Sequence, residues 1–402
     1  MTEPQSEAGL LTLAQTAARA AVSPATVRRW VREGLIPGYE GTWTPSAVAQ
    51  ARVIARLRSR GHTLAEIKQA SDKGQLAVGP IENLLNTQEG RYTLKEAARE
   101  AGLDRKLIER MYTTMGLSAL SLESVSDEDL EVMKYAAAML ATGFPLDAYF
   151  QLLRVYGQAI AQIADAEVRL FHLYIHEPLM RDGVPGVQIA EEMEGLAREV
   201  LPFAAPLMNY LHARFLAHFV EQDVVGHMET DLSEDALAEG RVRVAIAFAD
   251  LAGYSRLTVE LGDEVAVDAV ERFVDAAEQT LPADARVIKT LGDEVMVVGS
   301  DPVALTVWAI ELQAGIDADE PSARIGVHYG EALYRDGDYY GSDINQASRV
   351  VARAGGGEVL VTRAVVDGAT GADGLEFERI GEVRLKGFSE PTELFIASAR
   401  GS

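Results

Sequence analysis

Apolar residues in the first 230 positions recur mostly at spacings of three and four, which is the period of an α-helix that buries one face. Residues 10–70 predict a helix, a turn and a second helix, with Ser23 as the cap, Pro24 in the first helical position and Gly34 at the end. A short extended stretch at residues 39–43 precedes a further helix. This order of elements predicts a small helix-turn-helix unit.

The same order of signals returns about eighty residues further along the chain. Asp104 takes the place of the Ser23 cap, and Gly143 takes the place of Gly61, which interrupts the helical pattern. Agreement of caps, breaks and apolar positions in one order indicates an internal duplication. We therefore expect two helix-turn-helix units in tandem, followed by further apolar helices that need a partner, either a second copy of the chain or the domain beyond them.

From Val242 onward the apolar residues alternate, which is the period of a β-strand. A helix, a hairpin built from RVIKTL and VMVVG, a second helix and the strand ARIGVHYG follow in sequence. The order βαββαβ predicts an α+β domain with the ferredoxin-like fold. An acidic, small-residue stretch ahead of it predicts a linker.

The predicted parts of the chain are therefore a helix-turn-helix unit at 1–78, a second, duplicated unit at 79–155, a helical dimerisation or transducing region at 156–229, a linker at 230–241 and the α+β domain at 242–402.

The composition narrows the class of protein without changing this division. A length of 402 residues fits several domains, and the absence of cysteine excludes disulfides, thiolate metal sites and a cysteine nucleophile. The net charge of −24 disfavours nucleic acid and anionic membranes, although residues 1–75 hold ten Lys/Arg against six Asp/Glu. No apolar run reaches the roughly 18 residues that span a bilayer, and the N-terminus lacks a signal-peptide pattern, so we expect a cytoplasmic protein without a transmembrane segment.

Two aspartates of the α+β domain lie where the topology brings strand ends together. Asp250 ends the first strand, and Asp293 lies in the hairpin turn that begins the third strand. Because these strands are expected to run antiparallel, the two carboxylates should converge although 43 residues separate them. Such a pair can hold two Mg²⁺ ions and so favours phosphoryl chemistry. A lone aspartate in the turn Gly-Asp-Glu is otherwise a common turn residue.

Four segments strengthen the chemical interpretation. FADLAGYS, KTLGDEVM, ARIGVHYGEA and DYYGSDINQASR resemble the successive signature segments of class III adenylate cyclases, in the same order and over residues 241–400. The resemblance implies that the domain converts ATP into cyclic AMP. It also implies that Asp250 and Asp293 bind two Mg²⁺ or Mn²⁺ ions per active site, and that Lys289 and Asp338 read adenine. Guanine-reading relatives carry a glutamate and often a cysteine at these two places.

The resemblance assigns the remaining polar positions as well. Asn345 and Arg349 share one face of a helix, and in the family they orient the ribose and stabilise charge on the α-phosphate. The turn at Gly253 and Tyr254 offers backbone N–H groups to phosphate oxygens. Arg324 and Lys386 match triphosphate contacts, although Lys386 is also placed as an ordinary lysine at a strand end.

In the family, metal-binding residues come from one subunit, whereas the adenine-reading pair and the Asn/Arg pair come from the other. A chain that carries both sets should form a head-to-tail homodimer with two active sites.

The N-terminal half shows two weaker resemblances. The segment SPATVRRW is similar to the recognition region of MerR-type regulators, and residues 80–230 resemble the autoinhibitory region of some actinobacterial cyclases, which responds to pH or binds fatty acid. Three histidines, His212, His218 and His227, suggest a proton switch. The alternative function is a DNA-binding transcription regulator with a nucleotide-sensing C-terminal domain, in which Arg28 and Arg29 contact phosphates. Packing or dimerisation helices are equally consistent with this half.

Overall fold

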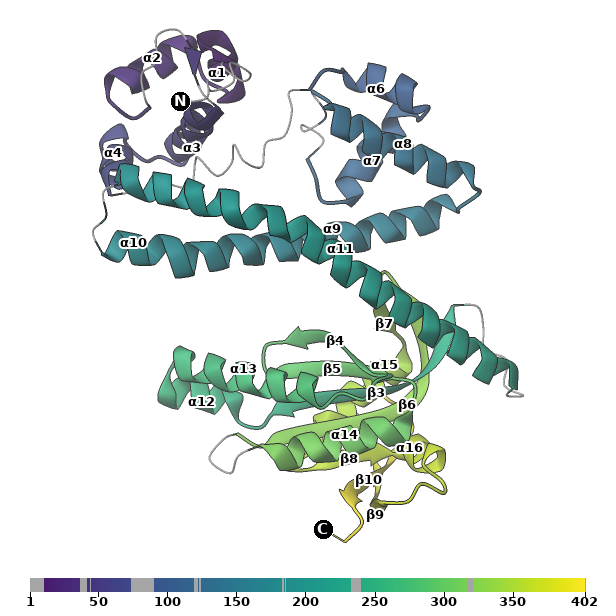
Figure 1. Cartoon of the computed structure of the whole chain (residues 1–402). Helices are drawn as coiled ribbons and strands as arrows, with labels where there is room; N and C mark the ends of the chain where they lie inside the picture. The colour runs from purple at the N-terminus through teal and green to yellow at the C-terminus, as the bar shows by residue number, and fades with distance from the viewer. Residues whose placement is uncertain are drawn as a thin grey trace. The chain divides into compact units, whose positions relative to one another are not determined.

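The computed structural model describes residues 11–36, 42–43, 45–73, 90–118, 122, 124–182, 184, 186–232, 240–316 and 321–401 (Figure 1). The chain divides into two compact units, Met1–Phe215 and Leu216–Ser402. The boundary lies within one long helix, α11 (Gly186–Leu232). Among the described residues, no helix combines the length and the apolar character that crossing a membrane requires.

The first unit begins with a capped helix pair and a two-stranded sheet. Its elements are β1 (Leu11–Thr12), α1 (Leu13–Arg19), α2 (Pro24–Arg32), β2 (Thr42–Trp43), α3 (Pro45–Ser59) and α4 (Leu64–Asp72). Ser23 caps α2 by accepting the N–H of Thr26 at 3.2 Å, as the sequence predicts. Trp30 and Ile54 are buried between these helices. The predicted cap at Thr44 and most of the extended stretch at 39–43 lie outside the described residues.

A second set of elements repeats this order within the same unit. It comprises α6 (Leu94–Ala101), α7 (Arg105–Thr114), α8 (Asp127–Ala141) and α9 (Leu146–Phe171). Helices α3 and α8 both have 15 residues and begin 82 positions apart. Asp104 caps α7 as Ser23 caps α2. The turn residues Ala21 and Gly102 both have positive φ, 52° and 71°, so the backbone repeats even where the residue type does not.

Long helices complete the first unit, and they cross two of the predicted boundaries. Helix α9 continues through residue 155, then η2 (His172–His176) and α10 (Glu177–Arg181) lead into α11. Helix α11 packs back against them: Ile189 and Met193 are buried against Phe171. It extends into the predicted linker and ends at Leu232, because acidic residues without a proline or glycine among them, as at 228–232, do not themselves end a helix. Residues 233–239 of that linker lie outside the described residues.

The predicted histidines lie on this last helix. The His212 ring is 6.4 Å from that of Tyr156 on α9, and the His218 ring is 5.4 Å from that of Phe219. The side chain of His227 lies outside the described set.

The second unit is built on a mixed sheet. Its elements after α11 are β3 (Arg241–Leu251), α12 (Tyr254–Leu261), α13 (Asp263–Gln279), β4 (Arg286–Leu291), β5 (Glu294–Gly299), α14 (Pro302–Gly315), β6 (Ala323–Arg335), β7 (Asp338–Tyr340), α15 (Ser342–Val351), β8 (Val359–Thr362), α16 (Arg363–Gly368), β9 (Leu375–Val383) and β10 (Thr392–Ala399).

The strand order is β4-β5-β3-β6-β8-β10-β9, with β7 paired to β6. The first four strands have the antiparallel ferredoxin-like order, which confirms the predicted βαββαβ arrangement. The sheet then continues through β8, β10 and β9, which the apolar alternation did not predict. The single helix expected after the first strand is interrupted at Gly262, whose φ of 93° favours glycine.

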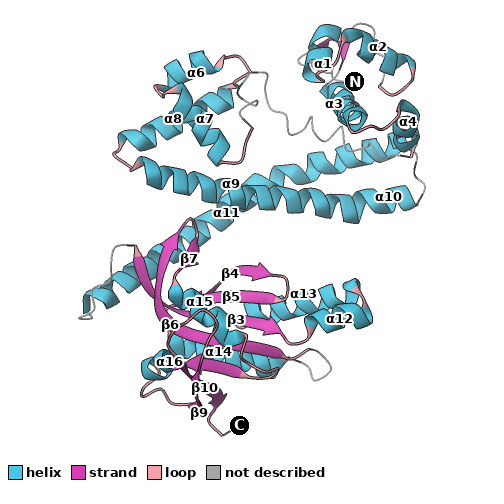
Figure 2. Cartoon of the chain, turned by 180° about the vertical axis from the view of Figure 1, so that it is seen from behind, coloured by secondary structure: helices cyan, strands magenta, loops and turns pink. Residues whose placement is uncertain are grey.

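Helices cover both faces of this sheet (Figure 2). On one face, α13, α14 and α16 bury Phe273, Trp308 and Val365 in a single core cluster with alanines of β3 and apolar residues of the neighbouring strands. On the other face, α15 packs directly on β6, where a Cβ on Gly326 would lie only 2.3 Å from the backbone nitrogen of Val351. Glycine at this position therefore allows the close approach that fixes α15, the helix that carries Asn345 and Arg349.

Candidate active site

The two predicted metal ligands lie at one end of the central strands. In the antiparallel pairing of β3 with β5, Asp250 is opposite Glu294, the residue after Asp293. The N–H of Leu251 also donates to the main-chain oxygen of Asp293 at 3.4 Å. Strand register thus brings the aspartates together, as the alternating pattern predicts.

Asp250 is nearly buried, with 7% of its surface exposed, and its carboxylate has a cationic partner. Arg324 is directly opposite Asp250 in the pairing of β3 with β6. Its Nε donates to Oδ2 of Asp250 at 2.8 Å, and its Nη2 forms a second, shorter contact with the same oxygen. A buried carboxylate needs such a partner, because burial without one is costly.

The neighbouring carboxylates remain crowded. Burial first, and then a hydrogen bond with Asp250, raises the pKa of Asp293. Burial, followed by the negative charges of Asp250 and Asp293, also raises the pKa of Glu294. Glu294 is not among the site residues predicted from the sequence; the signal for it was its place directly after Asp293 at the start of a strand. One guanidinium among three carboxylates leaves an excess of negative charge at this strand end.

This donor set fits divalent cations. Among the described residues, no three or more side chains of the His, Cys, Asp and Glu types form a ready metal cluster. Asp250 and Asp293 supply two carboxylates, and a bound cation would offset the burial and the neighbouring negative charge that raise the pKa of Asp293. Mg²⁺ commonly takes one or two carboxylates and completes its shell with water and substrate phosphates.

The predicted adenine-reading residues form a contact of their own. Lys289 on β4 donates from Nζ to Oδ2 of Asp338, the first residue of β7, at 2.5 Å. Both side chains are partly exposed, at 35% and 26%. The other carboxylate oxygen, Oδ1, accepts the N–H of Tyr339 at 2.8 Å. A donor and an acceptor are therefore held side by side at the sheet surface.

Asn345 and Arg349 are exposed on α15, one turn apart on the same face. The start of α15 is fixed by Asp343, whose Oδ2 accepts the N–H of Glu331 on β6 at 2.7 Å. Gly330 makes this possible, because a Cβ there would lie 2.1 Å from the same carboxylate oxygen.

The predicted phosphate contacts differ in their surroundings. Gly253 has φ 84° and precedes α12, and no side chain caps that helix, so the first N–H groups of α12 have no side-chain acceptor. The Tyr254 ring packs against the core of the sheet, which leaves its main-chain N–H as the group that a phosphate would contact. Lys386 is exposed in the turn after β9, and its neighbour Leu385 packs against Val350 of α15.

The candidate residues thus form separate groups within one chain. Asp250, Asp293 and Arg324 are together at the ends of β3, β5 and β6, whereas Lys289 and Asp338 pair with each other. In the part of the chain that the structure describes, no hydrogen bond or ion pair joins either group to Asn345 or Arg349.

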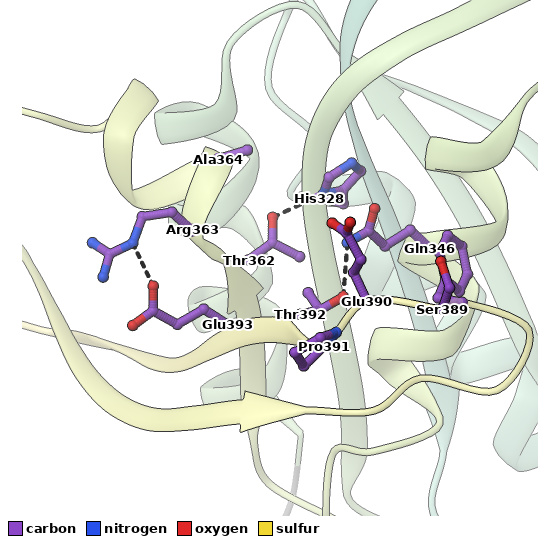
Figure 3. A pocket seen from close by; sticks show the side chains of 11 residues that line it. His328, Gln346, Thr362, Arg363, Ala364, Ser389, Glu390, Pro391, Thr392 and Glu393 are labelled. Atoms are coloured by element: carbon purple, nitrogen blue, oxygen red, sulfur yellow. Dashed lines mark hydrogen bonds and ion pairs between the residues drawn. The ribbon is translucent and has the colours of Figure 1, made fainter.

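A hollow of about 400 Å³ opens elsewhere on the same unit, beside β6, β8 and β10 (Figure 3). His328 bonds to the Thr362 hydroxyl at its wall, at 2.8 Å, and Arg363 donates to Glu393 at 2.8 Å. None of the candidate active-site residues lines this hollow.

Comparisons with known proteins agree with both units. The adenylate cyclase regulatory domain family matches residues 31–219, and the adenylate and guanylate cyclase catalytic domain family matches residues 238–398. An uncharacterized protein of Mycobacterium tuberculosis H37Rv is 30% identical over 361 residues, covering 86% of this chain and 89% of that protein.

Two further relatives have named activities. A protein of Mycobacterium tuberculosis named as a pH-sensitive adenylate cyclase is 28% identical over 86% of this chain and 87% of its own length. An adenylate cyclase of Streptomyces coelicolor is 28% identical over 71% of this chain and 74% of its own length.

The crowded carboxylates predict that Mn²⁺ binding strengthens with pH. Because the pKa of Asp293 and that of Glu294 are raised, protons compete with the cation at acid pH and leave as the pH rises. Calorimetric titration should therefore give a lower Kd for Mn²⁺ at pH 7.5 than at pH 5.5. Asp293→Asn should weaken binding and flatten this dependence, whereas Asp268→Asn on the exposed side of α13 should not. Equal affinity at both pH values would contradict the predicted competition between protons and the cation at these carboxylates.

Proposed function

This chain belongs to the adenylate cyclases that join a regulatory domain to a class III catalytic domain, and on that premise we propose that two copies assemble head to tail to form two shared active sites. The observation that carries the proposal is the separation of the candidate residues within one chain. The carboxylate group and the residues Lys289, Asp338, Asn345 and Arg349 have complementary tasks, and no hydrogen bond or ion pair joins the two sets among the residues that the structure describes. A second chain, turned head to tail, can bring one group to face the other.

The carboxylate group has the chemistry of the metal-binding half. The family generally uses divalent metal ions, and we propose two Mg²⁺ or Mn²⁺ ions held by Asp250 and Asp293. When bound, such ions supply Lewis-acid stabilisation of the triphosphate and lower the pKa of the ribose 3′-hydroxyl. Arg324 can exchange its bond to Asp250 for one to a triphosphate oxygen. The uncapped N–H groups after Gly253 add neutral donors to the same phosphates.

The Lys289–Asp338 pair suits adenine better than guanine. An ammonium can donate to ring N1 of adenine, and a carboxylate can accept from its exocyclic amine. Guanine reverses both groups, since it presents an N1–H donor and a carbonyl oxygen. The 2.5 Å contact between Lys289 and Asp338 holds both groups in place and satisfies their charges until a base exchanges with that bond.

The pair on α15, Asn345 and Arg349, suits the remaining task, which is to bind the ribose and the reacting phosphate. Asn345 can orient the ribose, and the fixed guanidinium of Arg349 can stabilise the charge that grows on the α-phosphate as the 3′-oxygen attacks it. Pyrophosphate leaves as the cyclic phosphodiester closes. Lys386 can contact the departing phosphates. Its neighbour Leu385 packs against Val350 and so holds this turn beside α15.

We propose that the regulatory domain restrains the catalytic domain. Helices α9 and α11 expose large apolar side chains, among them Val168, Phe203 and Tyr210 at 62%, 70% and 62%. Exposure on this scale supports burial of these helices in the dimer. Helix α11 then continues into the catalytic unit, so a change in its packing can reach the active site.

The repeated helix pairs agree with MerR-like units kept for packing rather than DNA binding. Arg29, a candidate phosphate contact, is paired with Glu33 at 3.0 Å on the same helix. In the second helix-turn-helix repeat, the corresponding helix α7 pairs Arg105 with Glu109 at 2.8 Å. The named relatives are cyclases, and this does not favour a DNA-binding regulator.

The catalytic proposal predicts that the purified chain converts ATP and Mn²⁺ into cyclic AMP and pyrophosphate. Asp250→Ala should lower kcat at least about 100-fold, because loss of a metal ligand removes several kcal/mol of transition-state stabilisation. The double variant Lys289→Glu/Asp338→Cys should raise the GTP-to-ATP ratio of kcat/KM by about two orders of magnitude. Lys106→Glu, the same charge reversal on exposed α7, should leave that ratio unchanged. An unchanged ratio in the double variant would refute the adenine assignment.

The regulatory proposal predicts a gain of activity on truncation. Residues 216–402, the second compact unit, should form cyclic AMP several-fold faster per mole of dimer than the full chain, because the restraining domain is gone. The assay is run over a range of protein concentrations. If the shorter chain dimerises more weakly, its specific activity will rise with protein concentration, and the limiting activity can still be compared with that of the full chain. A limiting rate no higher than that of the full chain would show that the regulatory domain does not inhibit.

A further inference from the structure

A cluster of one arginine and three aromatic rings lies beside the adenine-reading pair. Figures 1 and 2 both show the second part of α11 passing next to β7. Phe219, in this part of α11, lies over the guanidinium of Arg286 on β4, with 4.6 Å between the guanidinium carbon and the ring centroid. Gln222, one turn further along α11, donates to the main-chain oxygen of Ala283 at 3.3 Å. Helix α11 is therefore attached to the catalytic unit at the start of β4.

Arg286 also reaches across to β7. Its Nη2 donates to the Tyr339 hydroxyl at 2.8 Å, and its guanidinium carbon is 5.6 Å from the Tyr339 ring centroid. The Tyr334 ring, on β6, lies 5.1 Å from that of Tyr339. Arginine can make these contacts at once because its planar guanidinium donates at the edge and stacks on the face.

Tyr339 connects this cluster to base recognition. It follows Asp338 directly, and its N–H donates to Oδ1 of Asp338 while Lys289 holds Oδ2. The Tyr339 ring packs with Ile288 and Met296 on the α15 face of the sheet. Burial raises the pKa of its hydroxyl, so the group stays neutral and accepts the Arg286 hydrogen bond throughout the neutral pH range. The position of Arg286 thus sets the position of Tyr339, and Tyr339 orients the Asp338 carboxylate.

We propose that Arg286 is a positioning residue for base recognition, and that Phe219 makes the geometry of the adenine-reading pair depend on the position of α11. This inference rests on the proposed adenine-reading function of Lys289 and Asp338. It adds the route by which α11 acts on that pair: a shift of Phe219 moves Arg286 and Tyr339, and so changes affinity and selectivity for the base rather than the chemical step. In this proposal Arg286 and Phe219 act through Tyr339 and Asp338 and not through a contact of their own with the substrate.

Steady-state kinetics of the full chain with ATP and with GTP test the role of Arg286. Arg286→Gln should raise KM for ATP about fivefold or more, narrow the preference for ATP over GTP by a similar factor, and leave kcat within about twofold. Arg286→Lys keeps the charge but loses the planar stack. Its KM for ATP and its preference for ATP over GTP should lie between those of Arg286→Gln and the wild type. Tyr339→Phe, which removes only the hydroxyl that accepts from Arg286, should act in the same direction. Tyr334→Phe is the matched control and should match the wild type.

The contribution of α11 is tested by a double-mutant cycle. Phe219→Leu keeps an apolar contact without an aromatic face, and should raise KM for ATP in the same direction as Arg286→Gln. The double variant Arg286→Gln/Phe219→Leu should raise KM for ATP by less than the product of the two single fold-increases, because both substitutions act through one contact. Val220→Leu, at the neighbouring exposed position, is the control for α11. If the double variant instead raises KM by the full product of the two single fold-increases, the two residues act independently and the role assigned to Phe219 is wrong.

Two results would overturn the role of Arg286. One is an Arg286→Gln variant with unchanged KM and unchanged ATP-to-GTP preference. The other is a fall in kcat together with a lower Tm and no change in preference, which is the result of a purely structural role. A different result would show that the proposed adenine-reading function is wrong. In that case Lys289→Glu/Asp338→Cys leaves the base preference of the otherwise intact enzyme unchanged, whether or not Arg286 is substituted.

Discussion

The pairing of β3 with β5 on one side and β6 on the other is the constraint on which the catalytic unit depends. Because the three strands run antiparallel in a fixed register, Asp250, Glu294 and Arg324 must meet at one strand end, with Asp293 in the adjoining turn. Three carboxylates with one guanidinium carry an excess of negative charge in a partly buried place. Burial first, and the neighbouring carboxylates after it, raise the pKa of Asp293 and that of Glu294. A cation relieves the excess of negative charge, and this links strand register to the family's metal chemistry.

The same sheet keeps the other candidate groups away from the carboxylates. Lys289 and Asp338 satisfy each other across β4 and β7, and α15 is held on β6 by the close approach at Gly326 and by the Asp343 carboxylate. Each group of side chains is well positioned by itself, yet no hydrogen bond or ion pair among the described residues joins the groups into one site. In the proposed head-to-tail dimer each chain would supply the other half of each site, so control of assembly would also control catalysis. Helix α11 is placed to do this because it contacts the start of β4 through Phe219 and Gln222.

Local signals in the sequence were enough for the helix caps and the strand alternation, and the βαββαβ order that the alternation indicates then predicted the convergence of Asp250 with Asp293. Ser23 and Asp104 act within one turn, and a hairpin fixes its own register, so both can be read from neighbouring residues. Long-range pairing could not be predicted in this way. The three strands beyond β6, the position of Glu294 in the carboxylate group and the contact of Arg286 with Tyr339 depend on segments far apart in the sequence. Helices α9 and α11 run without a break across the predicted boundaries at residues 155 and 230, so no local signal in the sequence marks a division there.

The account as a whole depends on a site shared between two chains, and mixing two inactive variants measures this directly. Asp250→Ala removes the metal half, and Arg349→Ala removes the transition-state half. Unfolded or dissociated together and reassembled in equal amounts, they should yield about one quarter of the wild-type cyclic AMP formation, because half of the dimers are mixed and each mixed dimer has one intact site. Each variant alone should stay inactive. No recovery in a mixture whose mixed dimers are confirmed by native mass spectrometry would show that the two groups do not meet across chains.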